Sequence, residues 1–98
     1  MTNHHISFDI CKVAPGIYTA KALSKGVELT KPSNYDRIET AIREESLNIP
    51  HDFAHLVEFI YCGMLTGTLT VADAIDRALE LANRLVDLVA EEHRIMAR

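Results

Sequence analysis

The chain has 98 residues, of which 48% are hydrophobic and 24% are charged. This composition excludes an intrinsically disordered or fibrous protein, and the length leaves room for one domain, residues 1–98. Ten basic residues stand against fourteen acidic ones, and the formal net charge is −4. An acidic chain is poorly suited to nucleic-acid binding through phosphate contacts, so we do not expect a nucleic-acid partner.

The sequence carries no sign of export or membrane insertion. Charged residues interrupt the first 25 positions, so no signal-peptide core forms there, and no apolar run reaches the roughly 20 residues of a membrane span. Two cysteines, Cys11 and Cys62, are too few for the disulfide framework of a secreted domain. We therefore expect a cytoplasmic protein without membrane contact, whose two thiols are reduced and mostly buried.

The N-terminal third has the pattern of strands. Residues 5–13 alternate apolar and polar side chains, which places Ile6, Phe8 and Ile10 on one face. Pro15-Gly16 interrupts this run, residues 17–24 form a second one, and a turn at Lys25-Gly26 precedes a third at 27–30. Short connections between consecutive strands predict an antiparallel meander.

A helix is predicted over residues 34–47. Ser33 followed by Asp36 is typical of a helix N-terminus, because the hydroxyl can accept a hydrogen bond from an unpaired backbone N–H group. Apolar residues then recur at helical spacing, and Asn48 and Pro50 end the pattern.

Residues 52–69 leave two structures open. The stretch 56–62 is almost continuously apolar and rich in β-branched and aromatic residues, so periodicity cannot separate a buried strand from a buried helix. A strand would turn near Gly63 and return through residues 66–69. A helix would begin at Asp52 and stop at Gly63.

The C-terminal segment predicts a long helix over residues 71–97. Thr70 and Asp73 form a second capping pair, and neither Pro nor Gly interrupts the pattern. Such a helix would be about 40 Å long, which exceeds what a domain of this size needs.

Two apolar seams run along this predicted helix, one from Ile75 to Met96 and one from Ala74 to Ile95, the second interrupted by Glu92. Together they cover about half of the helix circumference, more than contact with one sheet requires. The second seam is then covered by residues 34–47, by residues 52–65 or by another copy of the chain. Because the helix outruns the domain, we predict a homodimer. The predicted interface residues are Ala74, Leu81, Leu85, Leu88 and Ile95.

A metal site is the alternative. His51, His55, Glu58 and Cys62 recur at helical spacing and could hold a transition metal on one stripe of a helix, but not on a strand. No nucleophile motif and no phosphate loop with its lysine occur in the sequence, so we predict no catalytic residue and no cofactor.

The sequence therefore predicts an α+β domain: an antiparallel sheet of three or more strands, beginning with a β-meander, packed on one face by helices that include a long C-terminal one. For function, we predict a small cytoplasmic interaction or regulatory protein without enzymatic activity. It would self-associate through the C-terminal helix and could also bind another protein. Binding of a metal or small ligand by the stripe from His51 to Cys62 is the alternative function.

Overall fold

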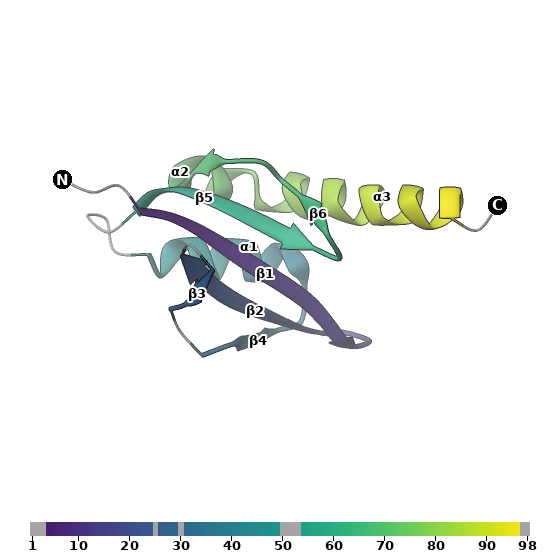
Figure 1. The fold of residues 1–98 in the computed structure, drawn as a ribbon, viewed down its shortest axis with the longest axis horizontal. Coiled ribbons are helices and arrows are strands. Elements are labelled where there is room, and N and C mark those ends of the chain that lie inside the picture. The colour runs from purple at the N-terminus through teal and green to yellow at the C-terminus, as the bar shows by residue number, and fades with distance from the viewer. Residues whose placement is uncertain (1–3, 25, 30, 50–53, 97–98) are drawn as a thin grey trace.

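The fold combines a sheet with helices, as the sequence predicts. The computed structural model describes residues 4–24, 26–29, 31–49 and 54–96. In chain order the elements are β1 (His4–Ala14), β2 (Ile17–Ser24), β3 (Val27–Glu28), β4 (Ser33–Tyr35), α1 (Ile38–Leu47), β5 (Ala54–Tyr61), β6 (Met64–Leu65), β7 (Leu69–Thr70), α2 (Val71–Asp76) and α3 (Ala78–Met96) (Figure 1).

The sheet has two central strands that are far apart in the sequence. Its order is β3-β2-β1-β5-β6, with β4 beside β2 and β7 beside β5. The pairs β1–β2 and β2–β3 are antiparallel, which confirms the N-terminal meander. The pair β1–β5 is parallel, so the sheet is mixed and not antiparallel throughout as predicted. Parallel neighbours require a crossover connection, and α1 lies within that connection.

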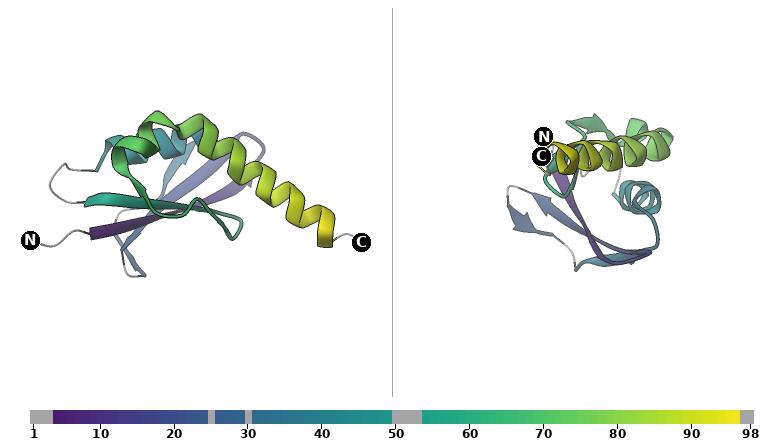
Figure 2. Two further views of the ribbon diagram at one scale, coloured as in Figure 1. Left: turned by 90° about the horizontal axis from the view of Figure 1, so that it is seen from above. Right: turned by 90° about the vertical axis from the view of Figure 1, so that its right-hand side faces the viewer.

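One face of the sheet carries the core. Alternation along the strands buries Ile6, Phe8 and Ile10 of β1 together with Val57 and Phe59 of β5. Phe8 and Phe59 are direct partners in the β1–β5 register, and their rings stack with centroids 5.1 Å apart. Figure 2 shows that α1 and the α2–α3 pair lie on this same side of the sheet.

The alanines of β2 have a packing role. Alanine is a weak strand former, yet Ala20 is completely buried and Ala22 nearly so. Because α1 packs on β2, small side chains at these positions let the helix approach the sheet closely. Packing thus outweighs intrinsic strand propensity here.

Helix α1 is shorter than predicted. It begins at Ile38 after an extended Arg37, and no side chain caps its N-terminus, so the predicted cap at Ser33 is wrong. Ser33 belongs instead to β4, whose residues pair with Ala20, Thr19 and Tyr18 of β2. Pairing with a distant strand therefore overrides the local helix signal.

The ambiguous segment forms a hairpin. Strand β5 reverses through Cys62 and Gly63, both with positive φ (50° and 82°), which suits a tight two-residue turn. The return arm runs through β6 and β7, and Thr66 bridges the gap between them. Its backbone N–H donates to the Phe59 carbonyl (3.0 Å), and its Oγ1 accepts from the Phe59 N–H (3.0 Å). The helical alternative, predicted from Asp52 to Gly63, is therefore wrong over residues 54–63, and residues 52–53 lie outside the described residues.

The C-terminal helix is interrupted. Thr70 Oγ1 accepts a hydrogen bond from the Asp73 N–H (3.1 Å), which confirms the predicted cap. The helix breaks at Arg77, where φ is −109° and ψ is 21°, and α3 then continues to Met96. Figure 2 shows α3 running out past the sheet, so the predicted excess length is present although the predicted continuity is not.

Candidate functional site

The first half of α3 is part of the core. Leu81 and Leu85 are fully buried within the chain, as is Ala74 of α2. These three predicted interface residues are thus covered intramolecularly, and helix α1 is among the elements that pack against α3. Leu88 and Ile95 are the two predicted interface residues that reach the surface, with exposed fractions of 37% and 60%.

The second half of α3, residues 86–96, is called the α3 extension below. Every residue in it is exposed except Val89, which is half-buried. Leu88 and Ile95 are seven residues apart, about two helical turns, so they lie on one side of the helix. Met96 is 78% exposed although it lies eleven residues, about three turns, after the buried Leu85. The stripe that faces the core therefore continues where there is no core to cover it.

The opposite side of the extension is polar and acidic. Asp87 and Arg94 are exposed there, and Arg94 pairs at 3.0 Å with Glu91, which is also exposed. An exposed pair of this kind contributes little to stability. Glu91 and Glu92 both lie between Leu88 and Ile95 along the helix, Glu91 at the border of the apolar stripe and Glu92 within it. The extension is consequently an amphipathic helix whose apolar side is interrupted by Glu92 and bordered by Glu91.

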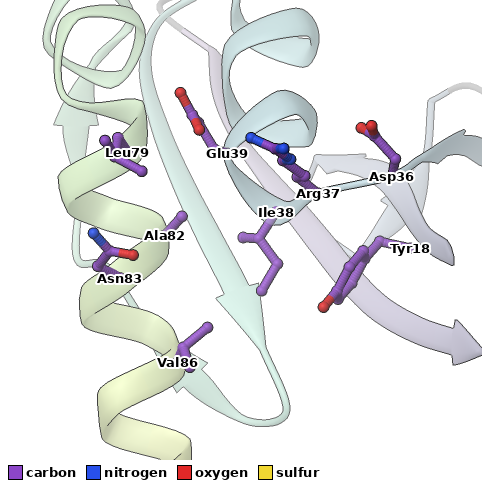
Figure 3. A pocket seen from close by; sticks show the side chains of 9 residues that line it. All are labelled: Tyr18, Asp36, Arg37, Ile38, Glu39, Leu79, Ala82, Asn83 and Val86. Carbon is purple, nitrogen blue, oxygen red and sulfur yellow. The ribbon is translucent and has the colours of Figure 1, made fainter. Parts of the chain in front are cut away.

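A shallow groove lies between α3 and the N-terminal end of α1 (Figure 3). Its volume is about 240 Å³. Leu79, Ala82 and Val86 of α3 form one wall, and Tyr18 and Ile38 stand opposite. Leu79 and Val86 are about half-exposed, so this side of α3 is also incompletely covered. Asp36, Arg37, Glu39 and Asn83 also line the groove, and Glu39 pairs with Arg43 at 2.8 Å. We interpret the groove as a packing surface.

The predicted metal stripe does not form. It requires a helix, whereas His55 and Glu58 belong to strand β5 and Cys62 to the following turn; His51 lies outside the described residues. Within the described part of the chain, no three His, Cys, Asp or Glu side chains gather as metal ligands would. The helical spacing that suggested the stripe therefore has no counterpart in space.

The two cysteines differ from expectation. Both Cys11 and Cys62 are free and exposed, whereas the sequence suggested buried thiols. The apolar run that contains Cys62 ends at Tyr61, and Cys62 itself is at the tip of the hairpin. Cys11 follows the last core residue of β1, Ile10, and points to the face without helices.

A buried polar contact joins β4 to α1. Tyr35 Oη donates to Glu45 Oε2 at 2.5 Å, and Glu45 is only 8% exposed. Burial, and then the hydrogen bond and the charge of Glu45, raise the pKa of Tyr35 to about 12. A carboxylate buried beside a phenol could suggest acid–base chemistry. Here the pair opens into no cleft that we find among the described residues, so we interpret it as structural.

No family model, no curated protein and no solved structure matches this chain. None of the described helices is both long and apolar enough to cross a membrane. Any functional inference therefore rests on the residues themselves.

Proposed function

We propose that this chain is a small interaction protein without enzymatic activity that self-associates as a homodimer through the α3 extension. The observation that carries the proposal is the stripe of Leu88, Ile95 and Met96, which continues the core-facing side of α3 beyond the sheet and stays exposed. Full burial of a Leu, Ile or Met side chain contributes about 1.5–3 kcal/mol, so a second chain that covers this stripe gains binding free energy.

A two-fold arrangement suits a single amphipathic helix. In a two-fold dimer the same patch faces itself, and antiparallel extensions would bring Leu88 of one chain near Ile95 of the other. Two exposed free thiols are compatible with a reducing compartment, and we propose the cytoplasm as the location.

Solution mass tests the proposal directly. We expect native mass spectrometry and light scattering to give twice the chain mass of 11.0 kDa for the wild type. The double variant Leu88→Glu, Ile95→Glu should have the mass of one chain, because it places charges in the apolar contact. Both positions are exposed, so the variant should keep the wild-type circular dichroism spectrum, and at concentrations where the wild type is monomeric it should keep the wild-type unfolding midpoint.

A matched control separates position from charge. Ala90→Glu adds the same charge to the same helix, but about 200° around from Leu88, and it should leave the dimer intact. Conversely, Glu92→Leu completes the apolar stripe and should strengthen self-association. A wild type with the mass of one chain at all concentrations, or equal dissociation by the control, would refute the proposal. Recovery only with a different protein would indicate a heterologous partner instead of a second copy.

A further inference from the structure

The two cysteines come directly after the last paired residues of two neighbouring strands. In the parallel pair of central strands, Ile10 of β1 is the partner of Tyr61 of β5, and this is the last pair of the register. Cys11 directly follows Ile10, and Cys62 directly follows Tyr61. They are separated by 50 residues in the sequence, and only the parallel pairing of β1 with β5 brings them side by side.

Alternation places Cys11 on the face of the sheet without helices. Ile10 faces the helices and is buried, so Cys11, which follows it in β1, turns to the uncovered face. Cys62 lies in the turn after β5 with a positive φ of 50°, so strand alternation does not set the direction of its side chain. Asp9 and Ile60 are laterally paired on the uncovered face and half-buried. Cys11 and Cys62 are both exposed and free, so reagents in solution can reach both thiols.

The spacing of sheet strands fits a disulfide bond. Neighbouring strands lie about 4.8 Å apart. Disulfides join Cα atoms that are about 4.4–6.8 Å apart, so laterally placed cysteines on adjacent strands fall within this range. Cys62 lies at the end of β5 in the turn, where its backbone is not constrained by the ladder on both sides.

Electrostatics at Cys11 agrees with this placement. Partial burial raises the pKa of the Cys11 thiol, and the nearby charges of Asp9 and Cys62 raise it further, against an opposing effect of Lys21. A charge on Cys62 can influence Cys11 in this way only when the two side chains are close. The raised pKa lowers the fraction of Cys11 thiolate at a given pH, which slows its attack on an oxidant.

We propose that Cys11 and Cys62 form a dithiol site that low-molecular-weight disulfides oxidise to an intramolecular disulfide bond. In the first step the Cys62 thiolate attacks one sulfur of the small disulfide, and one thiolate leaves. In the second step the Cys11 thiolate attacks Cys62 Sγ in the mixed disulfide and expels the other small thiolate. The cysteines lose two electrons and two protons, and the small disulfide is reduced to two thiols.

The bond would lock the two central strands together at their carboxyl ends. It closes a long loop, which restricts the unfolded chain more than a short loop would. We therefore expect the oxidised protein to melt at least about 5 °C above the reduced protein. Because a reducing compartment reopens such bonds, the site would respond to a rise in oxidised small thiols.

The test is intact mass after oxidation. Reduced protein is incubated with an excess of oxidised glutathione at pH 8, and excess reagent is removed. We expect the wild type to lose the mass of two hydrogen atoms, carry no glutathione and remain one covalent chain on a non-reducing gel. The variants Cys11→Ser and Cys62→Ser should instead retain one glutathione each.

The same experiment can overturn the proposal. A wild type that holds glutathione on both cysteines, or that forms chains linked to one another by disulfides, contradicts an intramolecular pair. Unfolding midpoints of the reduced serine variants should equal that of the reduced wild type, since both thiols are exposed. That comparison ensures that a missing bond reflects the distance between the thiols and not a damaged fold.

Discussion

The two halves of helix α3 have similar sequence patterns and opposite surroundings. Both repeat apolar residues at spacings of three and four. Leu81 and Leu85 in the first half are buried against the chain's own core, whereas Leu88 and Ile95 in the second half are exposed. An apolar stripe thus indicates that a helix packs against something. It does not show which part of the helix packs against the same chain and which part is left exposed. Five predictions test this contrast, from the largest expected effect to the smallest.

The largest effect is expected from a cavity in the buried half. Leu85→Ala should lower the free energy of unfolding by about 3 kcal/mol, because it removes a fully buried side chain and leaves a void. Urea denaturation monitored by circular dichroism measures this change. Leu88→Ala is the matched control, and at low protein concentration it should cost less than about 1 kcal/mol. Equal losses at the two positions would contradict the contrast between the halves.

The next effect concerns the contact that anchors α1, on which the buried half of α3 packs. Tyr35→Phe should cost about 1–3 kcal/mol, because it removes the hydrogen bond to the buried Glu45 carboxylate. Urea denaturation at pH 7 gives this value. A cost near zero would mean that Glu45 finds another partner or takes up a proton.

The same variant should change the dependence of stability on pH. In the folded chain the pKa of Tyr35 is raised to about 12, above the ordinary tyrosine value of 10.0. Between these values the unfolded chain loses a proton that the folded chain keeps, so stability falls as pH rises. Tyr35→Phe should make this fall shallower, although not absent, because the pKa of Tyr61 is also raised by burial. An unchanged slope would contradict the assignment.

A smaller effect is expected where α2 begins. Thr70→Ala should cost about 1 kcal/mol, since the Thr70 hydroxyl accepts the Asp73 N–H at the start of the helix. Thr70→Ser retains the hydroxyl and should restore most of the stability. If serine and alanine were equally destabilising, the loss would come from the strand pairing of Thr70 with Leu56 and not from the cap.

The smallest effect on stability is expected from removing part of the exposed half. A chain that ends at Ala90 loses only the exposed end of the α3 extension among the described residues, so its free energy of unfolding should change by less than about 1 kcal/mol. Sedimentation should nevertheless show loss of the proposed dimer. A large loss of stability in the monomeric state would show that the α3 extension supports the fold. The proposed difference between the buried and the exposed half of α3 would then be wrong.

Local patterns predicted the elements whose signals are continuous. Alternation at Ile6, Phe8 and Ile10 identified β1, and Thr70 with Asp73 identified the start of the C-terminal helix. One local signal was overridden by a distant contact: Ser33 pairs with Ala20 of β2 instead of capping a helix, and this pairing cannot be seen from its neighbours in the sequence. The helix break at Arg77 also has no local signal, because no proline or glycine marks it.

The candidate site was predicted in outline but not in position. The excess length of the last helix follows from its pattern, and Leu88 and Ile95 are exposed as a dimer contact requires. Leu81 and Leu85 share the same spacing, and only the placement of the other elements shows that they are buried. The pairing of Cys11 with Cys62 had no sequence signal, because it depends on the parallel register of β1 with β5.

The stacked rings of Phe8 and Phe59 also have a consequence during synthesis. These residues lie side by side in adjacent central strands, although about half of the chain separates them. A nascent chain emerging from the ribosome can close the β1–β2 hairpin early, but it cannot complete the central pair until β5 has left the exit tunnel. Because non-local pairing slows folding, the apolar face of that first hairpin stays open to chaperones until most of the protein has been made.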